Sequence, residues 1–311
     1  MKFLTTFLVI AFLINRLGWD TIVETLSSAR PSWLILALGI FFLSIWLGVI
    51  QWRILLSNRG IPLPFSRTFK LYFIGMFFNN FMVGGIVGDI VKVSSIRSRD
   101  GKGMAGFAAT FLDRFAGLWA LCGFAMAGSI VLLRKGALDG TGVTSAVVAL
   151  FATFMLFAGI MLFLTLKPLQ DIFFRITATA PFLKRLPVEQ IVSEILIDAR
   201  DFRLLFNVCT LSLCIQFSRI IVYALTAGSI GLVTMGNIHY FFIFVPVIAM
   251  LMTIPLPFGT REAFGGTLFA LAGFQLEAAF IMGFLASLVG IAASTLGGVF
   301  FITDKLHSPE R

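Results

Sequence analysis

The sequence predicts an all-α integral membrane protein that passes through a bilayer many times. Hydrophobic residues make up 59% of its 311 residues and charged residues only 13%, whereas soluble domains carry about 25% charged residues. Apolar runs recur along the chain, and several reach the roughly 20 residues that a helix needs to cross a bilayer. These runs are continuous and lack a period of two, which excludes a transmembrane barrel and favours helices.

Eight apolar segments follow one another without an intervening soluble domain, so residues 1–311 are expected to form a single membrane domain. The chain begins with a lysine and a short apolar run, as a signal peptide does, but no small-residue cleavage pattern follows promptly. We therefore expect an uncleaved first helix. The predicted segments are 3–15, 32–56, 67–83, 104–133, 143–166, 204–228, 238–256 and 277–302.

The longest polar interval, 167–203, contains the stretch "VEQIVSEILIDARDF". A helical projection places its aliphatic residues, Ile191, Val192, Ile195 and Leu196, on one face. The acidic residues point elsewhere in that projection: Glu189, Glu194, Asp198 and Asp201. This pattern is typical of a helix that lies on a membrane surface, and a plain cytoplasmic linker helix fits it equally well.

Loop charge predicts how the third segment meets the membrane. Arg53, Arg59, Arg67 and Lys70 precede it, and Lys92, Arg97, Arg99 and Lys102 follow it. A full crossing would put one of these basic clusters outside, against the positive-inside rule. We therefore expect a re-entrant helical hairpin at 67–96 that enters from the cytoplasm and turns near 79–85.

A second hairpin is predicted at 238–274, entering from the opposite face and turning at "PLPFGT" (255–260). Its prolines are alternatively explained by a kink in one continuous helix. The expected architecture is six full spans plus two oppositely inserted hairpins, with both termini in the cytoplasm. Segments interrupted by glycine or proline in both halves indicate a transporter built from inverted repeats, with broken helices meeting at the midplane.

Charged residues inside the apolar segments gather near the two predicted breaks. Each costs about 2.5–3.5 kcal/mol near the bilayer centre, so each needs a partner. The helix starts near Gly85 and Thr260 would also attract anions through unpaired N–H groups and the helix dipole. A static ion-pair network, with Gly84 and Gly88 serving only close packing, remains an alternative. These charged residues are Asp89, Lys92, Asp113, Arg114, Arg219, Arg261 and Glu262.

Three stretches of mixed polar and apolar residues occur along the chain in this order: "YFIGMFFNNFMVGGIVGDIVKVSSI", "FAATFLDRFAGL" and "IPLPFGTREAFGG". Together they resemble the flippase-like integral membrane family typified by the membrane region of lysylphosphatidylglycerol synthase, over about residues 30–303. The sequence departs from the family where "FMVGG" lacks the usual proline and where "PFGTRE" is shorter than the usual turn. The resemblance implies that the substrate-binding residues are Asn79, Asn80, Gly85, Gly88, Asp89, Asp113, Arg114, Arg261 and Glu262.

The resemblance implies a lipid flippase of a prokaryotic cytoplasmic membrane, which moves a phospholipid or another lipid-linked anionic headgroup between leaflets. Arg114 and Arg261 would hold the phosphate, because the planar arginine fork matches its oxygens. The acidic residues would pair the arginines or receive a cationic headgroup or a proton. Asn79 and Asn80 would satisfy backbone groups freed at the turn.

Two other function classes remain open: a membrane-embedded lipid-modifying transferase with Asp89 or Glu262 as base, and a non-catalytic scaffold. No nucleophile–histidine pairing and no GxxxxGK[ST] stretch is present, so we expect neither an enzyme nor direct ATP use. We expect no cofactor, metal or nucleic acid, and leave open a homodimer or an association with a lipid-modifying enzyme. The cysteines and histidines are isolated: Cys122, Cys209, Cys214, His239 and His307.

Overall fold

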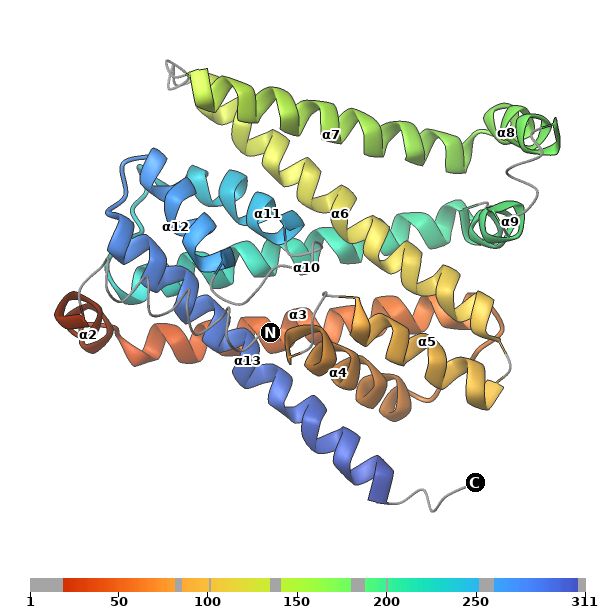
Figure 1. Cartoon of the computed structure of the whole chain (residues 1–311), viewed down its shortest axis with the longest axis horizontal. Helices are drawn as coiled ribbons and strands as arrows, with labels where there is room; N and C mark the ends of the chain where they lie inside the picture. Colours follow the sequence, from red (N-terminus) through yellow and green to blue (C-terminus); the bar gives the residue numbers. More distant parts are fainter. Residues whose placement is uncertain are drawn as a thin grey trace.

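The structure is a computed structural model of the chain, and every regular element in the residues it describes is a helix (Figure 1). Helices thus form where the apolar runs predicted them. The first predicted segment, 3–15, lies outside the described residues. The description covers residues 19–81, 86–100, 102–134, 141–179, 188–199, 201–251 and 260–306.

Within the described residues, four helices are long and apolar enough to cross a membrane: α3 (Pro31–Asn58), α6 (Gly103–Arg134), α10 (Phe202–Ser229) and most of α13 (Leu276–Leu306). A fifth candidate is the pair of α7 (Thr141–Thr165) and α8 (Lys167–Thr179), which meet at 91°. The chain is therefore a multi-pass helical membrane protein. The count of six full spans stays a prediction.

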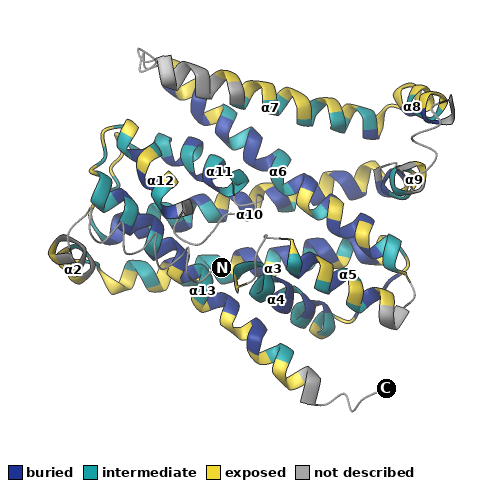
Figure 2. Cartoon of the chain, in the orientation of Figure 1, coloured by how far each residue is buried: buried dark blue, intermediate teal, exposed yellow. Residues whose placement is uncertain are grey.

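The centre of the molecule is the antiparallel pair of α3 and α10. Trp33 of α3 lies against Gly228 near the end of α10, and the Ser212 hydroxyl of α10 donates a hydrogen bond of 3.0 Å to Gln51 Oε1. The helices α6 and α13 each pack against both members of this pair and cross them obliquely (Figure 1). Buried residues line the facing sides of these helices, and exposed apolar side chains cover their outer sides (Figure 2).

Two short helical hairpins flank this centre. In the first, α4 (Phe65–Phe81) packs against α5 (Val87–Asp100), and in the second, α11 (Phe241–Leu251) packs against α12 (Thr260–Leu271). The rings of Phe241 and Phe269, 5.0 Å apart, join the two ends of the second hairpin. At 11 to 17 residues, these helices fall short of the length that spans a bilayer. The turns, 82–85 and 252–259, lie outside the described residues.

The two halves of the chain share one order of elements: a long helix, a hairpin and a second long helix. The helices α3 and α10 both have 28 residues. The helices α12 and α13 begin at Thr260 and Leu276, in each case 173 residues after the starts of α5 at Val87 and α6 at Gly103. The contacts also correspond, since α4 packs on α13 and α11 packs on α6, while α5 packs on α6 and α12 on α13.

The polar interval forms α8 and α9 (Val188–Ala199). On α9, Ile195 and Leu196 are buried in the protein core. Asp198 is also fully buried, so the prediction that it points elsewhere was wrong. The reason is a pair of contacts from the end of α3, where Asn58 Nδ2 and Arg59 Nε each donate to its carboxylate at 2.7 Å.

Arg59 also donates to Glu194 Oε2 at 2.9 Å, so α9 is held on the end of α3 by a cluster of polar contacts. Burial raises the pKa of the Asp198 carboxyl above its ordinary value, while the bonds from Asn58 and Arg59 oppose this rise. Helix α8 differs, because Ile172 and Ile176 are more than half exposed. An exposed apolar face suits a helix lying at a membrane surface.

Two short helices precede α3 and α11. Helix α2 spans Trp19–Ser27 and packs against α13, and the 3₁₀ helix η2 spans Ile238–Tyr240. The ring of Tyr240 stacks on that of Phe244 with centroids 5.7 Å apart, which joins η2 to the first turns of α11. These short helices therefore cap the end of the molecule where α10 ends.

The closest approach in the first hairpin is between Gly88 of α5 and Gly75 of α4. A Cβ atom at Gly88 would lie 1.7 Å from the carbonyl oxygen of Gly75. No side chain fits there, because a backbone carbonyl in a packed helix cannot move aside as a flexible side chain does. The hairpin therefore requires glycine at residue 88.

We expect Gly88→Ala to lower the free energy of unfolding by about 1–3 kcal/mol, because the added methyl group forces α4 and α5 apart. The measurement is a thermal denaturation of the purified protein in detergent. Gly123→Ala is the matched control, since a Cβ at this position in α6 meets nothing within 4 Å. Equal stability of both variants would contradict the packing described for the hairpin.

Candidate functional site

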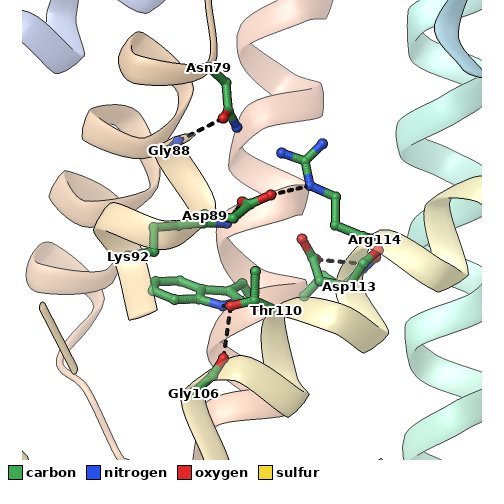
Figure 3. A network of polar contacts seen from close by, with 10 residues as sticks. Asn79, Gly88, Asp89, Lys92, Gly106, Thr110, Asp113 and Arg114 are labelled. Atoms are coloured by element: carbon green, nitrogen blue, oxygen red, sulfur yellow. Dashed lines mark hydrogen bonds and ion pairs between the residues drawn. The ribbon is translucent and has the colours of Figure 1, made fainter. Parts of the chain in front are cut away.

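The buried charges of the first half meet at the start of α5, between α5 and α6. Asp89, in the first turn of α5, is buried, and its Oδ2 accepts a hydrogen bond of 2.8 Å from Arg114 Nε on α6 (Figure 3). Its Oδ1 lies 2.9 Å from Lys92 Nζ, one turn further along α5. One carboxylate is thus shared by two cations.

Aromatic rings help to hold Lys92 in this position. Its Nζ lies 4.9 Å from the ring centroid of Trp52 on α3 and 5.0 Å from that of Tyr72 on α4. A desolvated ammonium gains from the negative face of each ring. With a side chain only 5% exposed, Lys92 is directed into the protein and is not available to a ligand from the membrane.

Arg114 differs from Lys92 because its side chain is 44% exposed. It lies 11 residues after Gly103, at which α6 begins, which places it about 16 Å along the helix. Among the described residues, its only recorded polar contact is the one from Nε to Asp89. The two terminal nitrogens of the guanidinium point away from Asp89, which holds the Nε side of the group (Figure 3).

The start of α5 is less open to an anion than the sequence predicted. Asn79 Oδ1, on α4, accepts the Gly88 N–H at 2.8 Å, and the N–H of Asp89 donates to the carbonyl of Ile86 at 2.9 Å. The carboxylate of Asp89 also occupies the first turn, where it complements the helix dipole. A second anion is repelled there, so the exposed cation of Arg114 is the better anchor.

A second set of polar contacts joins α6 to α3 and α10. Gln51 Nε2 on α3 donates to Asp113 Oδ1 at 2.9 Å, and Gln51 Oε1 accepts from Ser212 on α10. Nearby, Trp52 Nε1 donates to the hydroxyl of Thr110 at 3.1 Å (Figure 3). Asp113 thus has a neutral amide partner, in contrast to the doubly paired Asp89.

Sequence reasoning missed Gln51, which contacts Asp113 from α3. It also missed Ser212 and Thr110, which hold Gln51 and Trp52 of α3 in place. The available signal was an amide or hydroxyl inside an otherwise apolar span. That signal is weak, because such side chains can also form hydrogen bonds with backbone carbonyls of their own helix. The Thr110 hydroxyl does so as well, since it donates to the Gly106 carbonyl at 2.9 Å.

The structure gathers five of the predicted site residues around the junction of α4, α5 and α6. Asn80 follows Asn79 on α4 and is half-buried. Gly85 and the side chain of Arg261 lie outside what the structure describes. The five that come together are Asn79, Gly88, Asp89, Asp113 and Arg114.

Glu262 holds the corresponding place in the second half. It is buried in the first turn of α12 and accepts a hydrogen bond from Ser287 of α13. The separation of 25 residues between Glu262 and Ser287 equals that between Asp89 and Arg114. In each hairpin, an acidic residue in the first turn of the second helix thus contacts the long helix that follows. The recorded partner on that helix is a cation in the first half and a hydroxyl in the second.

Among the described residues, no three His, Cys, Asp or Glu side chains are grouped so that they could hold a metal ion. The three cysteines are free thiols. The chemistry that this site offers is therefore ionic and hydrogen-bonded recognition by a fixed arginine.

Removing Asp89 should cost more stability than removing Arg114. Asp89→Asn leaves the buried Lys92 without a carboxylate partner and should lower the free energy of unfolding by about 3 kcal/mol. Arg114→Gln leaves Asp89 paired with Lys92 and should lower it by about 1 kcal/mol. Thermal denaturation in detergent measures both, with Asp171→Asn on the exposed side of α8 as the control. A larger loss for Arg114→Gln than for Asp89→Asn would contradict the assignment of Lys92 as a partner.

Comparisons with known proteins place the chain in a family. The model of the family described as "Lysylphosphatidylglycerol synthase TM region" matches residues 1–298. No curated protein and no solved structure was found to match the chain. The family match covers nearly the whole sequence and confirms the resemblance carried by the motifs. This multi-pass membrane protein belongs to the lysylphosphatidylglycerol synthase transmembrane-region family.

Proposed function

We propose that this protein moves a phospholipid, or another lipid with an anionic headgroup, between the leaflets of a prokaryotic cytoplasmic membrane. The observation that carries the proposal is Arg114: a cation within a membrane helix that is 44% exposed and fixed from behind by a buried carboxylate. An exposed charge within an apolar span is costly, and such residues mark substrate pathways.

The correspondence of the two halves supports a transporter architecture. The helices α3 and α10 are antiparallel, and each is followed by a hairpin and a long helix. Inverted repeats of this kind place the substrate site where their broken helices approach each other. On this proposal, the hairpins enter the membrane from opposite faces, and both chain termini lie in the cytoplasm.

Arg114 would bind the phosphate through its terminal nitrogens, since the fork of a guanidinium matches two phosphate oxygens. Asp89 and Lys92 would keep the side chain in place without occupying its outer edge. The lipid tails would stay in contact with exposed apolar side chains such as Phe107 and Phe111, which lie on α6 just before Arg114. The headgroup alone would then need a polar path.

The test is reconstitution of the purified protein in liposomes that contain lipids with fluorescent headgroups. An impermeant quencher then reports how fast the inner-leaflet lipid becomes exposed. We expect the protein to speed this exposure, and Arg114→Gln to reduce the rate about tenfold, because a charge-assisted hydrogen bond of about 1.5 kcal/mol or more is lost. Arg261→Ala should also reduce it, if the sequence-predicted role of that residue holds.

Arg203→Gln is the matched control, since this arginine is exposed at the start of α10 and lies outside the site. Chromatography of the recovered lipid distinguishes the other classes. Conversion of the lipid to a new species would support a transferase. Absence of both exchange and conversion across anionic, zwitterionic and cationic lipids would contradict the proposal and favour a scaffold.

A further inference from the structure

A groove on the outer side of α3 is separate from the charged site. It has a volume of about 420 Å³, within the range of about 300–1,000 Å³ found for small-molecule sites. One face of α3 and the loop after it form its walls. The lining residues are Ile50, Arg53, Ile54, Ser57, Pro62, Leu63 and Pro64.

The groove and the charged site use opposite faces of α3. Arg53 and Ser57 are four residues apart and therefore lie on one face of the helix. Gln51 and Trp52 point toward α6, where they contact Asp113 and Thr110. A ligand in the groove would not touch Arg114, so the inference is independent of the proposed transport function.

The loop that forms one wall is held firmly. Arg59 fixes its start to α9 through Asp198 and Glu194, and Gly60 turns the chain with a positive φ of 65°. Ile61 and Leu63 are buried, which directs the loop back onto the core. The groove is thus preformed and does not need a loop to close over it.

Arg53 supplies the charge of the groove. Its Nε donates to the carbonyl of Leu63 at 3.2 Å, and no other polar contact of this exposed side chain is recorded among the described residues. The hydroxyl of Ser57, also exposed, has no recorded hydrogen-bond partner in the described part of the chain. The terminal nitrogens of Arg53 and this hydroxyl are therefore available to one anionic group.

The last turn of α3 carries the negative end of the helix dipole, so side chains have to supply the positive charge that an anion needs. The carbonyls of Leu55, Leu56 and Ser57 accept the N–H groups of Arg59 and Gly60, so they are not open to a further donor from the protein. On the other side, Lys102 Nζ donates to the carbonyl of Gly60 at 2.6 Å and adds positive charge beside the loop. The positive charge beside the groove therefore comes from the side chains of Arg53 and Lys102.

The depth of the groove indicates which negative ligand fits. Arg53 lies five residues before Asn58, the last residue of α3, or about 7 Å from the helix end. When α3 spans the bilayer, this position of Arg53 lies at the depth of the lipid headgroups. Ile50 lies deeper than Arg53 along this side of α3, and Ile54 lies between Arg53 and Ser57, so both could contact an acyl chain.

We propose that this groove binds one anionic phospholipid of the surrounding leaflet, with its phosphate on Arg53 and Ser57 and an acyl chain along Ile50 and Ile54. A free phosphate ion would gain nothing from the apolar wall. A zwitterionic phospholipid also carries a phosphate, but its ammonium group would be repelled by Arg53 and Lys102. The ligand class is therefore a lipid with net negative charge, such as phosphatidylglycerol.

The test is native mass spectrometry of the full-length protein released from detergent micelles, titrated with phosphatidylglycerol or phosphatidylcholine. We expect phosphatidylglycerol to bind in preference to phosphatidylcholine, and Arg53→Gln to weaken its first binding step about tenfold. Arg53→Lys should retain part of the affinity, because the charge remains while the fork is lost. Millimolar inorganic phosphate should not displace the lipid.

Arg203→Gln is the matched control, because it removes an exposed arginine at the same end of the molecule without touching the groove. Unchanged melting temperatures of both variants show that a loss of binding is not a loss of fold. Equal phosphatidylglycerol binding by Arg53→Gln and the wild type would overturn the proposal. Displacement of the lipid by inorganic phosphate would also overturn it. So would a wild-type dimer that becomes a monomer in Arg53→Gln while lipid binding stays unchanged.

Discussion

The arrangement depends on one constraint: bilayer hydrocarbon offers no partner to a polar group, so the protein has to supply each partner itself. The shared carboxylate of Asp89 shows how this is met. It neutralises Lys92 and Arg114 together, and the Asn79 side chain satisfies the N–H group that the helix break leaves at Gly88. A polar start of a helix can lie inside the protein only because these partners come from three helices.

The two halves answer the same constraint differently. Asp89 is paired with cations, whereas Glu262 accepts a bond from the Ser287 hydroxyl. Ser287 on α13 holds the place in the second half that Arg114 on α6 holds in the first, so one half has a cation at this position and the other a hydroxyl.

The apolar runs predicted the long helices well, because hydropathy reports directly on burial in lipid. The predicted segments 104–133 and 277–302 lie within α6 and α13. Loop charge also led to the pairing of α4 with α5, although how deep this hairpin inserts stays a prediction. The partners of single polar residues could not be predicted in the same way. Asp198 contacts Arg59, which is 139 residues away, and a helical projection contains no information about so distant a neighbour.

The packing of α4 on α13 has a consequence for biogenesis. Gly297 of α13 lies against the backbone of Phe73, where a Cβ would come within 2.0 Å of its carbonyl oxygen. The first hairpin therefore docks on a helix that is synthesised much later than the hairpin itself. Contacts between residues so distant in sequence form slowly. Loss of α13 should therefore harm the first hairpin as much as the second, because both hairpins pack on it.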